Sequence, residues 1–121
     1  MSQTELEACV RLDRQLERTE DLREADEKVI EAERAQLDAA EKDLNARRAK
    51  IDRTSQAAID TFNRQAEALR QRYAAFNQKV NAYNERLKDD NVLVERWNGT
   101  CANKSYYQSD MDAVVARLGP G

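Results

Sequence analysis

Apolar side chains in the second half of the chain recur at alternating spacings of three and four residues. The series reads Ile59, Phe62, Ala66, Leu69, Tyr73, Phe76, Val80, Tyr83, Leu87, Val94, Trp97 and Cys101, and only Asp90 interrupts it. This 3.5-residue period is typical of a helix whose apolar seam winds around a second helix. A helix that packs on a globular core drifts away from so strict a repeat. The pattern therefore predicts a long helix over residues 59–98.

The first half of the chain carries a sparser heptad line. Its apolar members lie seven residues apart, with Arg23 in the one polar slot: Cys9, Leu16, Ile30, Leu37, Leu44 and Ile51. A second set of apolar residues flanks this line: Leu6, Leu12, Leu22, Val29 and Ala40. Together they predict a helix over residues 4–51.

The two heptad lines are out of phase, and the segment between them is the predicted turn. Continued beyond Ile51, the first line would reach polar Gln65 instead of joining the second line. Residues 52–58 fill the gap, and Thr54 or Ser55 can cap the helix that follows.

A chain that doubles back at this turn pairs the two lines in one antiparallel register. The pairs are Ile51 with Ile59, Leu44 with Ala66, Leu37 with Tyr73, Ile30 with Val80, Leu16 with Val94 and Cys9 with Cys101. A register set by a turn near the sequence midpoint thus also brings the only two cysteines together. We predict an all-α fold, a long antiparallel two-helix coiled-coil hairpin.

The last part of the chain predicts a loop and a short helix. Asn98-Gly99 is a typical helix exit, so residues 99–108 are expected to form a loop. Ser109 is then expected to cap a helix over residues 109–118. The apolar face of this helix is expected to fold back on the open end of the hairpin, and its members are Met111, Val114, Val115 and Leu118. All 121 residues are expected to form a single helical domain.

Composition agrees with long helices and narrows the range of partners. Charged residues make up 36% of the chain and aromatic residues 6%, and all three glycines follow Asn98. This profile is typical of a coiled coil. With a net charge of −3, the chain lacks the overall positive charge that attracts nucleic acid. No apolar run reaches the ~20 residues of a membrane span, and the opening MSQTELEACV is no signal peptide. Either the protein is cytosolic, or the first Met replaces a leader that has been removed.

Cys9 and Cys101 are the candidates for a disulfide. A disulfide needs Cα atoms within about 4.4–6.8 Å, which is closer than the ~8–10 Å between packed helix axes. Cys101 follows the predicted helix exit, so its backbone is free to approach Cys9. The alternative is two reduced, half-buried thiols in a cytosolic protein. We expect no metal site and no cofactor, because the chain has no His and two thiols do not complete a zinc shell.

Five asparagines recur at one heptad position beside the seam, with Arg70 in the missing slot: Asn63, Asn77, Asn84, Asn91 and Asn98. Asn is a mediocre helix former. One hypothesis is a polar ladder that fixes the register of the hairpin, as a buried polar residue does in a coiled coil. In the predicted register it would face polar groups such as Glu33 and Asp26. The alternative is a relic of heptad duplication on a wet face.

A second apolar row on the same predicted helix consists of Phe62, Leu69, Phe76, Tyr83 and Trp97. The opposite helix offers mostly polar residues to it: Arg47 or Arg48, Glu33 or Arg34, and Asp26 or Glu27. An exposed apolar row marks an interface, so the row is a candidate surface for a second copy or another protein. The alternative is that the aliphatic stems of the arginines cover the rings within the chain.

Two segments resemble a loose group of small uncharacterised bacterial coiled-coil proteins, which are often exported. The segments are FNQKVNAYNERL and VERWNGTCANKSYYQSDMDAV, within residues 59–115. Members of the group have a long acidic helix, a second helix with aromatic-Asn heptads and a Cys-x-x-Lys/Arg-x-Tyr ending. The resemblance implies a bacterial, periplasmic or exported setting and brings no known activity.

These patterns predict a structural or protein–protein interaction module. It would be a rigid, disulfide-clasped hairpin that presents the aromatic row to a protein partner or to a second copy. The alternative is a cytosolic coiled-coil adaptor or regulator with reduced thiols that dimerises through a continuous helix. We expect no enzymatic activity, because the chain has no His base, no Gly-rich phosphate loop and no nucleophile elbow.

Overall fold

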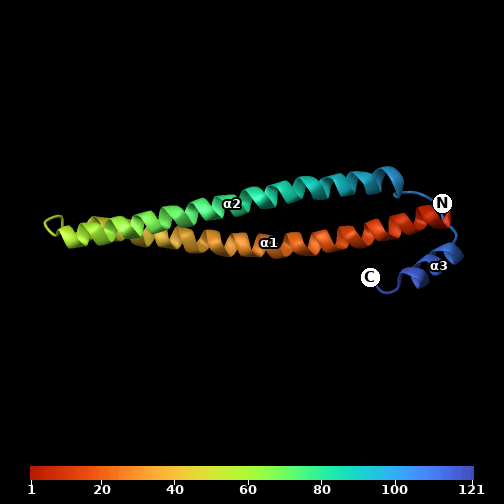
Figure 1. Cartoon of the computed structure of the whole chain (residues 1–121), viewed down its shortest axis with the longest axis horizontal. Coiled ribbons are helices and arrows are strands. Elements are labelled where there is room, and N and C mark those ends of the chain that lie inside the picture. The colour runs from red at the N-terminus through yellow and green to blue at the C-terminus, as the bar shows by residue number, and fades with distance from the viewer. The chain divides into compact units, whose positions relative to one another are not determined.

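The computed structural model describes residues 1–121 and contains three α-helices and no strand. Helix α1 spans Gln3–Lys50, α2 spans Gln56–Thr100 and α3 spans Gln108–Leu118. The predicted class is confirmed: two long helices form an antiparallel hairpin and a short third helix follows (Figure 1). The continuous helix of the alternative prediction is not observed, because the chain turns between α1 and α2.

The chain divides into two compact units, which are described one at a time. The turn unit consists of residues 25–84, with the end of α1, the connection and the start of α2. The clasp unit consists of residues 1–24 and 85–121, with the start of α1, the end of α2 and all of α3. Within each unit, the α1 and α2 segments run side by side in opposite directions (Figure 1).

In the turn unit, short-range hydrogen bonds define the connection between the helices. The Asp52 carboxylate accepts hydrogen bonds from the backbone amide and the hydroxyl of Thr54, at 2.9 and 2.6 Å. Ser55 then caps α2, because its hydroxyl accepts a hydrogen bond from the amide of Ala58 at 3.2 Å. Of the two predicted caps, Ser55 is therefore the one that the structure uses. The helix begins at Gln56, three residues before the expected start.

Contacts between α1 and α2 in the turn unit follow the predicted register. The guanidinium of Arg34 lies 5.6 Å from the ring centre of Phe76, and that of Arg48 lies 5.5 Å from that of Phe62. Further along, the Tyr83 hydroxyl donates a hydrogen bond to Glu27 at 2.5 Å. Each pair occupies facing positions in the predicted pairing.

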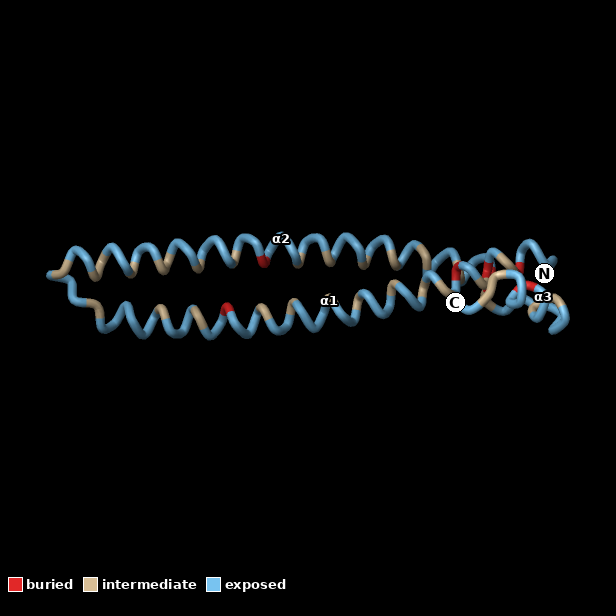
Figure 2. Tube along the Cα trace, turned by 60° about the horizontal axis from the view of Figure 1, so that its bottom comes forward, coloured by how far each residue is buried: buried red, intermediate tan, exposed pale blue.

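The core of the turn unit is a thin seam. Only Leu37 and Phe76 are buried, at 0% and 6% exposure. The other apolar heptad residues, such as Ile30, Leu44 and Val80, are half-buried. Most of the unit is exposed, as the predominantly pale blue helices of Figure 2 show. A two-helix pair has only one contact face per helix, so it buries few side chains completely.

In the clasp unit, α2 continues through Gly99 and ends at Thr100, so the predicted exit at Gly99 is wrong. Glycine inside a helix costs about 1 kcal/mol relative to alanine, a penalty that packing can offset. The amides of Cys101 and Ala102 both donate to the carbonyl of Trp97, at 2.8 and 3.0 Å. The left-handed residue that follows is Asn103, with φ of 60°.

The heptad line of α2 also drifts in the clasp unit. Val94, predicted opposite Leu16, is exposed, and Leu93 packs against the buried cluster instead. A straight helix has 3.6 residues per turn and loses about 20° per heptad against a strict seven-residue repeat. The apolar contact therefore moves to the neighbouring residue of the helix.

A capping box starts α1. The Ser2 hydroxyl accepts a hydrogen bond from the Glu5 amide at 3.1 Å, and the Glu5 carboxylate accepts one from the Ser2 amide at 3.3 Å. This reciprocal pairing satisfies two amide groups that a helix start leaves without partners. Leu6 follows directly and is buried.

Helix α3 packs on the start of α1. Gln3 donates a hydrogen bond to Asp110 at 3.0 Å, and Arg117 pairs with Glu7 at 3.4 Å. Val114 of α3 is fully buried. Val115, expected on the same apolar face, is 42% exposed instead, because it lies one residue and about 100° further round the helix.

The start of α3 differs from the prediction. The amides of Asp110 and Met111 bond to the carbonyl of Tyr107, so the helix begins at Gln108 and Ser109 lies inside its first turn. Tyr107 occupies the cap position without a side-chain hydrogen bond. The prediction that Ser109 caps this helix is therefore wrong.

None of the three helices combines the length and the apolar character needed to cross a lipid bilayer.

Candidate functional site

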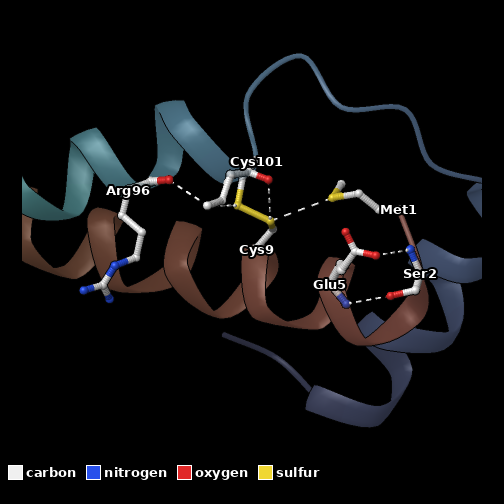
Figure 3. The surroundings of a disulfide bond; sticks show 7 residues. Met1, Ser2, Glu5, Cys9, Arg96 and Cys101 are labelled. Carbon is white, nitrogen blue, oxygen red and sulfur yellow. Dashed lines mark hydrogen bonds between the residues drawn. A yellow bond between two sulfur atoms is a disulfide. The ribbon is translucent and has the colours of Figure 1, made fainter.

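The clasp unit brings together the two cysteines that the sequence places 92 residues apart. Their Sγ atoms lie 2.06 Å from each other and their Cα atoms 5.7 Å, at disulfide distance (Figure 3). The predicted proximity of Cys9 and Cys101 is therefore confirmed. Cys9 lies inside α1, whereas Cys101 directly follows the last residue of α2, and its amide still bonds to the Trp97 carbonyl.

The disulfide is the centre of the main buried cluster of the clasp unit. Cys9, Leu12 and Cys101 form this cluster, each 6–7% exposed. Partly buried apolar side chains pack against it: Met1, Leu16, Leu93 and Trp97. Sulfur–sulfur bonding and apolar burial thus act at the same place, and both hold the end of α2 against the start of α1.

Polar and sulfur atoms surround the bond at longer range (Figure 3). The Cys9 sulfur lies 3.9 Å from the Met1 sulfur and 3.9 Å from the Thr100 carbonyl oxygen. A disulfide sulfur carries no hydrogen, so these are contacts without a donor. The Thr100 hydroxyl lies 3.4 Å from the Cys101 sulfur and itself donates to the Arg96 carbonyl at 2.7 Å.

Two surface depressions reach the disulfide, and both cysteines line each of them. The larger, of about 790 Å³, is bounded by the start of α1, the residues after α2 and α3. Its apolar wall includes Trp97, Tyr106 and Met111. The smaller, of about 540 Å³, lies between α1 and the last turns of α2.

The smaller depression carries an excess of positive charge. Its charged side chains are Arg11, Arg96 and Glu5. Arg11 pairs with Glu7 at 3.5 Å, whereas the Arg96 guanidinium has no carboxylate partner. Hydrogen bonds from Ser2, the backbone amide first and then the hydroxyl, lower the pKa of Glu5, so this carboxyl is ionised at neutral pH. One negative and two positive side chains therefore border this route to the disulfide.

The predicted aromatic row is packed within the chain. Phe76 is buried, and Phe62, Leu69, Tyr83 and Trp97 are half-buried. In the turn unit the guanidinium groups of Arg34 and Arg48 lie over the two phenylalanine rings. In the clasp unit Trp97 packs on the disulfide cluster. Arginine stems and guanidinium planes thus cover part of the aromatic faces within the chain, as the intrachain alternative expects. Binding of a second copy or another protein to this row stays a prediction.

The structure places the asparagine ladder on the surface. All five side chains are exposed: Asn63, Asn77, Asn84, Asn91 and Asn98. The expected partner Glu33 is instead paired with Lys79, whose amine lies 2.8 Å away. A lysine stem spans the distance between the helices that the short asparagine side chain does not reach. The structure therefore offers no cross-helix bonding for the register-fixing hypothesis.

Residues outside the predicted site contribute to it. Ser2 and Glu5 start α1 with a capping box, and their S-x-x-E spacing is a known sequence signal for one. Arg96 lines the smaller depression, and no sequence pattern singles it out, because it belongs to neither the apolar heptad line nor the asparagine series of α2.

Comparison with protein-family models, with curated proteins and with solved structures finds no match. The site is therefore interpreted from its own geometry. That geometry provides a covalent link between two helix ends, a small apolar cluster around it and a neighbouring depression lined by two arginines and one glutamate.

Proposed function

We propose that the chain is a structural or protein–protein interaction module, a helical hairpin in which a disulfide fastens the end of α2 to the start of α1. The approach of Cys9 and Cys101 is the observation that carries the proposal. A hairpin with so thin a seam gains little from apolar burial. A covalent link that restrains the unfolded chain compensates for this weakness.

In this proposal, less of the aromatic row is accessible to a partner than the sequence suggests. Because Arg34 and Arg48 cover the rings of Phe76 and Phe62, the aromatic row offers only partial surfaces to a protein partner or to a second copy. A partner that binds there has to displace the guanidinium groups or pack on their outer faces. We therefore propose weak, reversible association through this row, with a protein and not with nucleic acid.

The proposed setting is an oxidising compartment, periplasmic or otherwise outside the cytosol. Disulfides persist in such compartments, and cytosolic thiols are kept reduced. The resemblance of residues 59–115 to exported bacterial coiled-coil proteins supports the same setting. The proposal assigns the chain no reaction and no cofactor.

The competing proposal is a cytosolic adaptor with reduced thiols. In it the chain would dimerise through one continuous helix. The turn stabilised by Asp52 and Ser55 argues against it, because a continuous helix would lose the hydrogen bonds these side chains make in the turn.

Intact mass measurement of protein from its native host, with free thiols blocked on lysis, tests the clasp. A monomer two hydrogens lighter than the reduced chain, with no blocked cysteine, supports it. Two blocked thiols on a folded protein would favour the adaptor.

Light scattering over a range of concentrations tests the association. We expect a monomer at micromolar concentration and reversible self-association only at higher concentration. An F62L/F76L variant keeps apolar packing but removes both rings and should weaken association. A stable dimer whose mass does not change on dilution would contradict weak association through the row.

A further inference from the structure

We propose that the smaller depression is a thiol–disulfide exchange site for small anionic thiols, through which the Cys9–Cys101 bond can be opened without unfolding of the chain. The proposal rests on the disulfide but not on the module function. A negative result would leave a purely structural clasp in place.

Access is the first requirement of exchange. A thiolate has to reach a sulfur atom of the disulfide directly. The cysteines are only 6% and 7% exposed, yet both line the depression of about 540 Å³ between α1 and α2. A small thiol occupies far less than this volume, so such a molecule fits into a depression that both cysteines line.

The charge of the depression is the second requirement, because it determines whether anionic or cationic thiols are favoured. Arg11 and Arg96 outnumber Glu5 at this depression, and Arg96 has no carboxylate partner. Positive side chains attract an incoming anion and stabilise thiolates next to them. The protein as a whole carries a net charge of −3 and repels anions. A preference for anionic thiols would therefore originate locally, at the two arginines that line the depression.

The exchange itself is balanced without any further reagent. A thiolate forms a bond to one cysteine sulfur, and the Cys9–Cys101 bond breaks with its electron pair on the other cysteine, which takes a proton from water. A second thiolate attacks the mixed disulfide, and the remaining cysteine leaves and is protonated. Two small thiols are oxidised to one small disulfide, and the protein gains two electrons and two protons.

Opening the bond removes the only covalent cross-link between the start of α1 and the end of α2. One polar contact between α1 and the segment after Thr100 is the exposed hydrogen bond from the Met1 amine to the Ser105 carbonyl at 2.7 Å. Exposed polar contacts contribute little to stability. Reduction should therefore loosen the segment after Thr100 before it affects the turn unit.

The test compares three thiols of similar size on the folded oxidised protein: 2-mercaptoethanesulfonate, 2-mercaptoethanol and cysteamine. Initial reduction rates are measured by quenching and mass spectrometry, and each rate is corrected for the thiolate fraction. At low salt, we expect the anionic thiol to react several-fold faster than the cationic one, a gap that should shrink in molar salt because of screening.

The variant Arg96→Gln tests whether Arg96 causes the faster reaction of the anionic thiol. We expect it to slow the anionic thiol roughly two- to fivefold and to leave the neutral thiol unchanged, as the loss of one nearby charge predicts. Arg64→Gln is the matched control, because Arg64 is an exposed arginine of the turn unit. Its rates should equal those of the parent chain.

Two outcomes overturn the proposal. One is an equal corrected rate for all three thiols at low salt. The other is a rate that levels off with thiol concentration at one value common to all three, since reduction would then wait for unfolding. Both outcomes are read from the unmodified protein, so neither depends on the folding of a variant.

Discussion

The two units of the molecule share the same two helices and hold them together by different means. Five of the seven buried apolar residues belong to the clasp unit: Leu6, Cys9, Leu12, Cys101 and Val114. The turn unit buries only Leu37 and Phe76, and it adds a short hydrogen-bonded connection and two arginine–ring contacts. In the turn unit, the backbone connection holds the two helices together with few buried side chains. In the clasp unit, which has no such connection, a disulfide and a third helix hold them together.

Removing the covalent bond should have the largest effect and should fall mainly on the clasp unit. In the chain-entropy model, a bond between residues 92 apart contributes about 4–5 kcal/mol. We expect the variant C9S/C101S to unfold at a much lower urea concentration. Amide hydrogen exchange should speed up more in residues 1–24 and 85–118 than in the turn unit. Equal loss of protection in both units would contradict the division drawn here.

Truncation of the turn unit's core should have the next largest effect. Leu37 is fully buried, so Leu37→Ala is expected to lower the free energy of unfolding by about 2–4 kcal/mol. The matched control is Leu22→Ala on the same helix, because Leu22 is 63% exposed and should cost less than about 0.5 kcal/mol. Urea titrations followed by circular dichroism measure both. Equal costs would mean that the thin seam is not what holds this unit.

Replacement of exposed asparagines by alanine should raise the free energy of unfolding. Alanine is a better helix former than asparagine by roughly 0.5 kcal/mol per residue. The variant N77A/N84A in the turn unit is therefore expected to gain about 1 kcal/mol and to stay a hairpin, as checked by urea titration and light scattering. A loss of stability, or a new oligomeric state, would restore the register-fixing role of the ladder.

The smallest expected effect is a response of the turn unit to alkaline pH. The Tyr73 hydroxyl donates a hydrogen bond to Glu41 at 2.9 Å, and this bond raises the pKa of Tyr73 above its ordinary value of 10.0. Because the folded pKa is the higher one, the contribution is complete below pH 10 and is lost as pH rises through the folded pKa.

The variant Tyr73→Phe should remove that alkaline step from a plot of urea midpoint against pH. Tyr107→Phe is the control, since Tyr107 is 78% exposed and lies in the clasp unit. It should leave the step in place. If both variants behave alike, the alkaline response does not come from the Tyr73–Glu41 bond.

Heptad spacing alone was enough to predict both long helices, the turn and the approach of Cys9 to Cys101. These features depend on the apolar pattern and on one short loop, both of which are local properties of the sequence. The capping box at Ser2 and Glu5 was missed, although its S-x-x-E spacing is a local signal that could have revealed it.

The errors have specific physical causes. The predicted helix end at Gly99 is wrong, because α2 continues to Thr100, next to the cluster that contains Cys9 and Cys101. For the aromatic row the sequence left two possibilities open, and only the contacts of Arg34 with Phe76 and of Arg48 with Phe62 show that rings are covered within the chain. Both features depend on contacts between residues far apart in the chain, which a repeat pattern does not contain.

The position of the disulfide also determines whether the fragments separate after a single proteolytic cut. The connection between α1 and α2, residues 51–55, is mostly exposed, and so is most of both helices. A single cut anywhere between Cys9 and Cys101 nevertheless leaves two fragments that stay attached through sulfur. Nicked protein would keep its full mass, apart from one added water, until a reductant separated the pieces.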